Sequence, residues 1–277
     1  MLNTIRTVAD LRVQVAAWKK AGLRVAMVPT MGALHEGHLS LVRLAREKAD
    51  RVVTSIFVNP TQFAPHEDFD AYPRAEARDA GLLDSAGCHV LYAPTAAEMY
   101  PDGFATSVSV TGVSEPLDGK ARPHHFGGVA TVVAKLLNQC GPDLAIFGEK
   151  DYQQLLVIRR LVRDLDLPVE IVGAPTARDH DGLALSSRNA YLSAEQRQVA
   201  SALPRILKEA ATTGSDIEAT EKRAADELLA AGFDKVDYVE FRDGEDLTKL
   251  SGKAEAGTRI FVAAWLGKTR LIDNMAV

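Results

Sequence analysis

Two histidines, His35 and His38, are the residues of this chain whose type and spacing first suggest chemistry. They close the stretch 28–38, which begins where an apolar run ends and stops where apolar residues with helical spacing begin, so a strand, a tight turn and a helix start meet here. If the helix begins near Gly37, both imidazoles face the same side of its first turn. A helix start favours a phosphate group, and two rings can donate further hydrogen bonds to phosphate oxygens. A surface or capping role fits the pattern about equally well, whereas a metal site is disfavoured because no carboxylate or cysteine cluster accompanies the pair.

The elements that must position this turn follow an alternating pattern. Apolar runs alternate with segments of helical periodicity, and the runs lie at residues 23–28, 52–58, 89–92, 143–147 and 169–172. This alternation predicts an α/β fold with a parallel, doubly wound, Rossmann-like sheet. Ligands of such sheets bind outside the carboxyl ends of the strands, so we expect the polar segments that follow the runs to converge on one cleft. These segments are residues 29–38, 59–63, 148–151 and 174–188.

The remaining stretches carry weaker patterns. Alternation at residues 107–110 predicts a short strand, and the apolar spacing of residues 129–138 predicts a helix. The charge-rich stretch 66–79 predicts a solvated loop and a helix start.

The pattern changes after residue 178 to helices followed by neighbouring strands. Helices are expected at residues 193–211 and 216–231, and strands at residues 236–241, 259–265 and 269–272. We therefore expect two domains, a first at residues 1–178 and a smaller α+β domain at residues 179–277.

Residues 179–189 are unusually polar and lie at this expected boundary. The hydroxyls of Ser186 and Ser187 beside the planar fork of Arg188 make an oxyanion clamp plausible on chemical grounds. The alternative for this stretch is an exposed linker between domains.

Composition restricts the function further. The chain has 277 residues, is 47% hydrophobic and 25% charged, and has a mean hydropathy of -0.06, as expected of a globular protein. The net charge of -5 provides no general attraction to nucleic acid or to an anionic membrane. Cys88 and Cys140 lack metal-ligand or redox spacing, so we expect free thiols in a reducing cytoplasm. We also expect no signal peptide and no transmembrane helix.

Five stretches occur in an order that identifies a family: residues 29–38, 55–63, 125–133, 148–154 and 181–189. Together they resemble the pantoate–β-alanine ligase (pantothenate synthetase) family of the HxGH nucleotidyltransferase superfamily. The HxGH motif, His35 to His38, indicates only a nucleotidyltransferase when taken alone. The five stretches in this order are typical of the one family, and the resemblance covers nearly the whole chain.

The resemblance implies an ATP-dependent ligase of pantothenate biosynthesis, on the coenzyme A pathway and in the cytoplasm. The carboxylate of (R)-pantoate would attack the α-phosphorus of ATP bound to Mg²⁺, giving pantoyl adenylate and pyrophosphate. The amine of β-alanine would then attack the acyl carbon and release AMP. The first domain would bind nucleotide and pantoate, the second would act as a lid, and the protein would be a homodimer. The expected partners are these small molecules, not nucleic acid or membrane.

The resemblance also implies roles for individual residues towards ATP. Catalytic roles are implied for His38 as proton donor and for the groups that contact or neutralise the phosphates, namely His35, Lys150, Ser186, Ser187 and Arg188. Gly148 and Asp151 would hold the ribose, and Ala177 and Leu185 would lie near adenine. Met31 and Gly32 would complete the ATP-binding set.

Substrate binding is implied for four residues: Met31, Asn59, Gln62 and Gln154 would contact pantoate, and Gln62 would also contact β-alanine. An amide both donates and accepts hydrogen bonds, which suits hydroxyl and carboxylate groups. No protein ligand for a metal is implied.

Three residues depart from the family pattern. Leu185 stands where Met is usual, Ala177 replaces a larger aliphatic residue, and His124 stands where Gly is common. None of the three changes removes a charged group, so activity is still expected.

Two alternatives remain from the residues alone. One is another HxGH nucleotidyltransferase that acts on a different small acceptor, and the second is a nucleotide-binding regulatory module without catalysis. Gln62 and Gln154 favour an unphosphorylated acid as acceptor, which disfavours the first alternative. A module that only binds a nucleotide does not need His35, His38, Lys150 and Arg188 together, which disfavours the second.

Overall fold

The computed structural model describes residues 2–64, 67–213 and 216–277, and contacts divide the chain into two compact units. The N-terminal unit comprises Met1–Glu149 and Gln154–Pro175, and the C-terminal unit comprises Lys150–Gln153 and Thr176–Val277. The short stretch Lys150–Gln153 therefore groups with the C-terminal unit although it precedes the end of the N-terminal unit in sequence.

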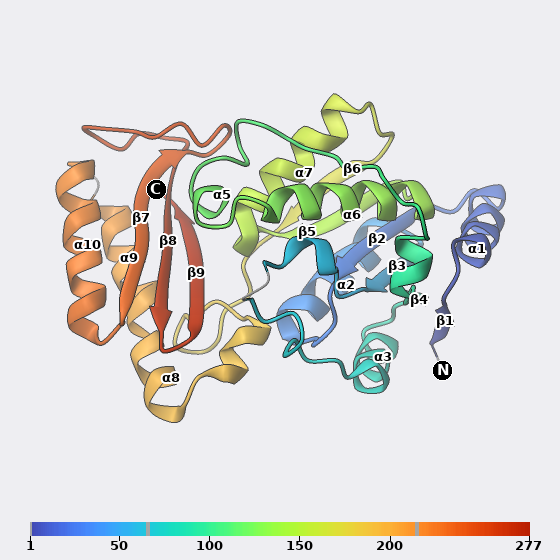
Figure 1. Ribbon diagram of the computed structural model, residues 1–277, viewed down its shortest axis with the longest axis horizontal. Helices are drawn as coiled ribbons and strands as arrows, with labels where there is room; N and C mark the ends of the chain where they lie inside the picture. The colour runs from blue at the N-terminus through green and yellow to red at the C-terminus, as the bar shows by residue number, and fades with distance from the viewer. Residues whose placement is uncertain (1, 65–66, 214–215) are drawn as a thin grey trace. The chain divides into compact units, whose positions relative to one another are not determined.

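A six-stranded sheet in the order β1-β4-β3-β2-β5-β6 forms the N-terminal unit, and every pairing in it is parallel (Figure 1). Its strands are β1 (Asn3–Ile5), β2 (Val25–Thr30), β3 (Arg51–Ile56), β4 (Val90–Tyr92), β5 (Leu144–Gly148) and β6 (Glu170–Ala174). The helices between them are α1 (Val8–Lys20), α2 (Glu36–Lys48), the 3₁₀ turn η1 (Pro60–Gln62), α3 (Glu76–Ser85), α4 (Ala96–Met99), α5 (Asp118–Ala121), α6 (His125–Cys140), η2 (Glu149–Asp151) and α7 (Tyr152–Asp164). The prediction of a parallel, doubly wound sheet is confirmed.

Strand β2 shows why its sequence requires helices on both faces. All of Val25–Val28 is buried, and Ala26 and Val28 pack into one core cluster with Leu41 and Val42 of α2. Successive side chains of a strand point to opposite faces, so Val25 and Met27 face the other layer, where α1 and α6 contact β2 and one another.

The topology favours one particular point of the sheet for a ligand site. The chain runs outward from β2 through β3 and β4 on one side, and from β5 to β6 on the other, so the direction of winding reverses between β2 and β5. Ligands of doubly wound folds bind at the carboxyl ends of the strands beside such a reversal. Strand β2 ends in the histidine turn (residues 29–38), and β5 ends at Gly148.

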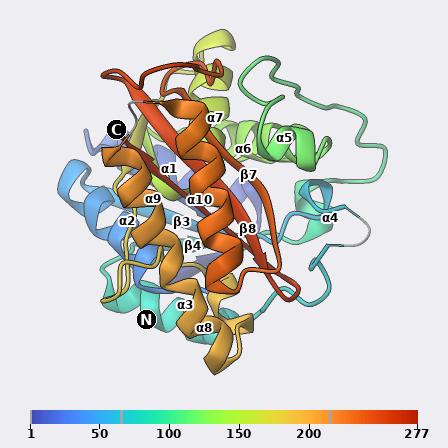
Figure 2. The same ribbon diagram turned by 90° about the vertical axis from the view of Figure 1, so that its left-hand side faces the viewer.

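The C-terminal unit is an antiparallel three-stranded sheet with helices packed on it. Its strands, in the order β7-β8-β9, are β7 (Lys235–Asp243), β8 (Thr258–Leu266) and β9 (Thr269–Ala276). Its helices are η3 (Ser187–Tyr191), α8 (Ala194–Ala200), α9 (Ala202–Thr212) and α10 (Ile217–Ala231). Helices α9 and α10 lie side by side across this sheet (Figure 2), and their apolar faces share one core cluster with Phe241, Ile260 and Val262. The expected α+β character is confirmed.

Three sequence predictions differ from the structure. The helix expected at residues 193–211 is divided at Ser201 into α8 and α9, and Pro204 lies in the first turn of α9, where a missing N–H is tolerated. Residues 107–110 form no strand among the described residues, and Val108 N donates instead to Thr131 Oγ1 at 2.9 Å. The stretch 66–79 is not wholly solvated, because the side chain of Asp79 is 1% exposed; His66 lies outside the described residues.

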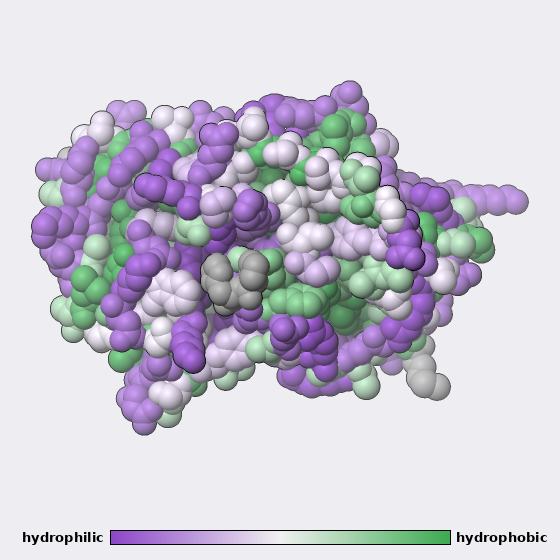
Figure 3. Space-filling model, viewed as in Figure 1, coloured by the Kyte–Doolittle hydropathy of each residue, from purple (hydrophilic) through white to green (hydrophobic). Residues whose placement is uncertain are grey.

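The surface shows no dominant hydrophobic region on the face drawn in Figure 3, where hydrophilic residues are interspersed with hydrophobic ones. Among the described residues, the exposed large hydrophobic side chains are scattered along the sequence: Val13, Phe104, Leu165, Tyr191, Leu229 and Val277. Among residues 2–64, 67–213 and 216–277, no helix is long and apolar enough to cross a membrane.

Candidate active site

The histidine turn is held by side-chain to backbone hydrogen bonds at the carboxyl end of β2. Thr30 Oγ1 donates to Ser55 O of β3 at 2.7 Å and accepts from Gly32 N at 3.2 Å, which ties the start of the turn to the sheet. Gly32 has a φ of 84°, and a Cβ there would lie 3.0 Å from Ile56 Cγ2. Only glycine meets both requirements without displacing its neighbours.

His35 is the N-cap of α2, and His38 lies in the first turn, as the spacing predicts. Gly37 N donates to His35 Nδ1 at 3.1 Å, and His35 N donates to His38 Nδ1 at 3.4 Å. A ring nitrogen that accepts a hydrogen bond carries no proton, so in each neutral ring the proton is on Nε2. The ring centroids are 4.1 Å apart. The structure thus brings the pair together with two Nε2–H donors beside the positive end of a helix, which suits an anion.

Asp79 of α3 supports this turn and was missed by the sequence analysis. Its carboxylate is buried and accepts from Ala33 N at 2.8 Å and from Leu34 N at 3.0 Å. Ala33 has a φ of 51°, a conformation that costs a residue with a Cβ about 1 kcal/mol. Asp79 therefore stabilises a strained backbone immediately before His35. A weak signal existed, because Asp79 is four positions before the buried Leu83 and so shares its helix face.

A second set of candidate residues meets at the carboxyl end of β3. Asn59 is 1% exposed, and its Nδ2 donates to Gln62 Oε1 at 3.1 Å and to Gly128 O at 3.2 Å. Its Oδ1 accepts from Tyr100 OH at 2.8 Å. Gln62 Nε2 in turn lies 3.3 Å from Met31 Sδ, in hydrogen-bonding geometry. The structure therefore brings Met31, Asn59 and Gln62 together and holds the amide of Gln62 at both ends.

Helix α6 fixes the backbone beneath Gln62. A Cβ at Gly128 would lie 2.4 Å from Thr61 O, so only glycine lets the helix approach η1 this closely. His125 Nδ1 donates to Gln62 O at 3.0 Å. Burial, reinforced by the charge of Arg122, lowers the pKa of His125 to about 4, so this ring is neutral near pH 7.

A half-buried ion pair between Arg122 and Glu67 lies near Gln62. Arg122 Nε and Nη2 donate to the two carboxylate oxygens of Glu67 at 2.6 and 2.7 Å. Burial alone would raise the pKa of Glu67, but the hydrogen bonds and charge of Arg122 lower the pKa below its ordinary value. The ion pair therefore joins the segment that follows Gln62 to the residues just before α6.

Two further candidates of the N-terminal unit, Gln154 and Gly148, do not belong to the hydrogen-bond network around Gln62. Gln154 is half-buried in the first turn of α7, and within the described part of the chain no hydrogen bond joins it to Met31, Asn59 or Gln62. Gly148 ends β5, and a Cβ there would meet nothing within 4 Å. The backbone at Gly148 is therefore open to a ligand.

In the C-terminal unit, residues 176–188 fold back on themselves. Arg178 and Ala184 form an antiparallel bridge, and Leu185 N donates to Ala177 O at 2.9 Å. The structure thus brings together the two residues that the resemblance implies for adenine. Ser186 caps η3, and its Oγ accepts from Arg188 N at 3.3 Å, so Ser187 and Arg188 lie in the first turn of a short helix.

Lys150 and Asp151 also belong to the C-terminal unit. Lys150 Nζ lies 3.7 Å from Asp151 Oδ1, and the side chain of Lys150 is 18% exposed while that of Asp151 is 47% exposed. Asn274 Nδ2 of β9 donates to Lys150 O at 2.9 Å and fixes the backbone at this position. No motif in the sequence marks Asn274.

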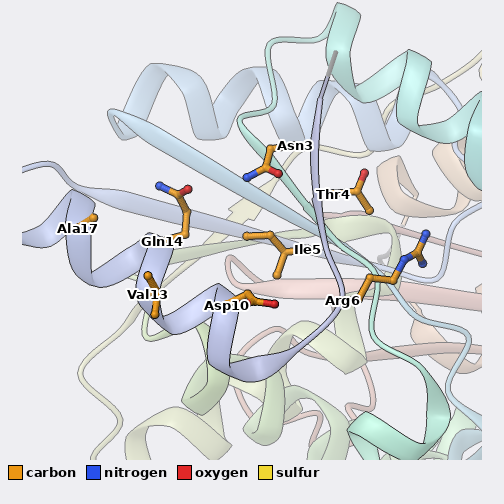
Figure 4. Close-up of a pocket in the computed structure, with 8 residues that line it drawn as sticks. All are labelled: Asn3, Thr4, Ile5, Arg6, Asp10, Val13, Gln14 and Ala17. Carbon is orange, nitrogen blue, oxygen red and sulfur yellow. The ribbon is translucent and has the colours of Figure 1, made fainter.

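A pocket of about 470 Å³ lies elsewhere, along the edge strand β1 and helix α1 (Figure 4). It is lined by Asn3, Thr4, Ile5, Arg6, Asp10, Val13, Gln14 and Ala17. None of these residues is a candidate from the motifs, so this pocket is separate from the histidine turn.

Comparison with known proteins gives consistent results over the whole chain. The model of the family described as Pantoate-beta-alanine ligase matches residues 3–276. Pantothenate synthetase of Caulobacter vibrioides is 66% identical over 278 residues, covering 99% of this chain and 98% of the relative. Pantothenate synthetase of Rhodospirillum rubrum is 59% identical over 279 residues, covering 100% and 99%.

Solved structures agree with these matches. The crystal structure of pantothenate synthetase from Thermus thermophilus superposes with a TM-score of 0.91 at 50% identity and covers 99% of both chains. Pantoate–β-alanine ligase from Francisella tularensis, complexed with β-γ ATP and β-alanine, superposes with a TM-score of 0.86 at 34% identity, covering 100% of this chain and 98% of the other.

Proposed function

The chain belongs to the pantoate–β-alanine ligase family, and from this premise we propose that it joins pantoate to β-alanine through a pantoyl adenylate, with cleavage of ATP to AMP and pyrophosphate. The β-γ ATP and the β-alanine with which the Francisella tularensis relative is complexed support these two substrates. The observation that carries the proposal is the histidine turn, where two Nε2–H groups lie at the start of α2 beside the winding reversal of the sheet.

In the first step, a carboxylate oxygen of pantoate attacks the α-phosphorus of ATP. A new P–O bond forms, the bond to the bridging oxygen breaks, and pyrophosphate leaves with that electron pair. His35 and His38 donate hydrogen bonds from Nε2 to phosphate oxygens, and His38 thereby stabilises the negative charge that builds up on the departing pyrophosphate. This assignment is supported by the tautomer that the Nδ1 contacts impose.

The acceptor is held by the network around Gln62. The amide of Gln62 binds the hydroxyl and carboxylate groups of pantoate, Asn59 orients it, and Met31 packs against the dimethyl carbon. Gln154 adds a second amide. In the second step, the amine of β-alanine, bound beside Gln62, attacks the acyl carbon; the C–O bond to AMP breaks, and the amine loses a proton.

Residues of the C-terminal unit serve the nucleotide. Lys150 and Arg188 neutralise negative charge on the phosphates, and Ser186 and Ser187 donate hydrogen bonds to phosphate oxygens. Asp151, together with the open backbone at Gly148, holds the ribose. Ala177 and Leu185, which a backbone hydrogen bond joins, present an apolar surface to adenine. Gly32 and Met31 contribute backbone contacts to ATP from the histidine turn.

Magnesium is expected to enter with ATP. Among the described residues, no group of three or more His, Cys, Asp or Glu side chains could hold a metal ion on its own. Mg²⁺ commonly keeps several waters and binds through substrate phosphates, so the protein needs no preformed cage for it. We assign no protein ligand to the ion and no catalytic step to it.

Two further properties belong to the same proposal. A homodimer and a cytoplasmic location are expected from the family. Sedimentation of the purified protein and fractionation of the source cells test these two points separately.

ATP–pyrophosphate exchange tests the reaction itself. We expect exchange to require pantoate but not β-alanine, and AMP release to require both. Exchange that proceeds without pantoate, or AMP release that ignores β-alanine, would overturn the proposal. The alternative of another HxGH nucleotidyltransferase with a different acceptor is disfavoured, because the family match extends over residues 3–276 rather than over the histidine turn alone.

A further inference from the structure

Strand β9 carries two consecutive polar residues that are almost wholly buried, Asp273 at 2% and Asn274 at 4% exposure. In an antiparallel strand that packs under helices, the inward positions are normally apolar. Leu271 and Asp273 share one face, and Leu271 belongs to the core cluster under α9 and α10. A polar pair that breaks this rule calls for a function, because local exceptions concentrate at functional sites.

Asp273 holds the segment 176–188. Arg178 Nη1 donates to Asp273 Oδ2 at 2.7 Å, and Nη2 donates to Oδ1 at 2.9 Å. Arg178 Nη1 also donates to Gly182 O at 3.0 Å, so the same guanidinium closes the loop that returns to Leu185. This ion pair fixes the strand-like bridge immediately before Ser186.

Asn274 holds the segment 150–153, which bears Lys150, and it does so from the opposite face of the strand. Its Nδ2 donates to Lys150 O at 2.9 Å, and its Oδ1 accepts from Arg259. Arg259 stacks on Tyr152, with its Cζ 3.9 Å from the ring centroid, and Tyr152 OH donates to Gly244 O at 3.1 Å. These contacts explain why Lys150–Gln153 group with the C-terminal unit.

We propose that Asp273 and Asn274 are positioning residues, which hold the segments bearing Lys150 and Ser186–Arg188 in one fixed arrangement for the nucleotide phosphates. One rigid strand sets the spacing between the two cations, because the segments attach to adjacent residues on its two faces. The inference rests on the proposed function, since it assumes that Lys150 and Arg188 bind phosphate.

Asn274→Asp is the selective test, because the carboxylate still accepts from Arg259 but places an oxygen against Lys150 O in place of a donor. We expect the KM for ATP in pantoate-dependent exchange to rise about tenfold, the scale of one lost buried hydrogen bond. The KM for pantoate should stay within about twofold, because its proposed ligands lie in the N-terminal unit. Asn138→Asp is the matched control: Asn138 Nδ2 donates to Ala134 O at 2.8 Å within α6, far in sequence from β9.

A second readout does not depend on catalysis. Hydrogen exchange followed by mass spectrometry should show faster exchange in residues 150–153 of Asn274→Asp, with the protection of β7 and β8 retained, and no such change in Asn138→Asp. If Asn274→Asp does not fold, Asp273→Asn, which keeps the shape but removes the charge opposite Arg178, should raise the KM for ATP in the same way. An unchanged KM for ATP, or unchanged exchange at residues 150–153, overturns the inference. Absence of pantoate-dependent exchange in the unmodified protein contradicts the proposed function instead.

Discussion

The substitution Asp79→Asn tests whether a buried carboxylate sets the geometry of the histidine turn. Asp79 accepts two backbone hydrogen bonds, from Ala33 N at 2.8 Å and Leu34 N at 3.0 Å. An amide of the same shape has one accepting oxygen, so one N–H donor would face an NH₂ group and lose its partner. A hydrogen bond to a charged group contributes about 1.5–3 kcal/mol, and Ala33 retains its strained φ of 51° without full support. We therefore expect a loss of about 2–3 kcal/mol in the free energy of unfolding.

Asp79→Asn should also lower the reaction rate of the protein that remains folded, in addition to lowering its stability. Displacement of Ala33 and Leu34 moves the N-cap His35, and small misplacements of positioned groups cost roughly 10²-fold in rate. We expect kcat for ATP–pyrophosphate exchange to fall about 10- to 100-fold in the folded protein. Urea unfolding and exchange kinetics on the same preparation separate the two effects.

Asp143→Asn provides the matched control. Asp143 Oδ2 accepts from Val25 N at 2.7 Å, so it makes the same kind of contact at the opposite end of β2. We expect this variant to lose stability but to keep kcat near that of the unmodified protein. If Asp79→Asn keeps its kcat within about twofold, or Asp143→Asn loses as much, the positioning argument is refuted.

Three further predictions concern the same unit. His38→Ala should lower the rate of adenylation at least ~10²-fold in a single-turnover assay, because a hydrogen-bond donor that stabilises charge on the phosphates is removed; turnover near normal would contradict its role. Gly128→Ala should raise the KM for pantoate about tenfold or more, since the new Cβ would lie 2.4 Å from Thr61 O, whereas Gly127→Ala, where a Cβ meets nothing within 4 Å, should leave this KM unchanged. Because the pKa of His125 is lowered to about 4, the unfolded chain binds a proton below pH ~6.5 that the folded protein excludes, so stability should fall by about 2 kcal/mol between pH 7 and pH 5. Urea unfolding of His125→Asn should show a correspondingly smaller loss; an equal loss would assign the effect to other groups.

Local patterns in the sequence were sufficient for the sheet and for the histidine turn. Strand β2 is a continuous apolar run because both of its faces are covered, and Gly32 and Gly37 mark the turn that follows. The prediction of a strand at residues 107–110 is wrong, because alternation alone does not require pairing with another strand. Alternation there reflects contact with Thr131 of α6 rather than pairing with a neighbouring strand, and periodicity does not distinguish the two.

Supporting residues were not predictable, because their partners are backbone groups far away in the sequence. Asp79 is 46 residues from Ala33, and Asn274 is 124 residues from Lys150. In the sequence, Asp79 ends a charge-rich stretch, and such a stretch normally indicates solvent. Only the fold shows that this acid faces amide donors.

Two buried side chains support the segments that bear proposed site residues, one in each unit. The histidine turn depends on a carboxylate of α3, whereas the Lys150 segment depends on an amide of β9, and each supporting side chain is buried and binds backbone rather than substrate. A buried group that binds backbone holds a segment independently of the side chains on that segment. A proposed site residue can therefore be replaced with little change in the backbone that presents it, except where its side chain also caps a helix, as that of His35 does. For this reason we expect substitutions of His38 to impair chemistry with little loss of stability, and substitutions of Asp79 to impair both.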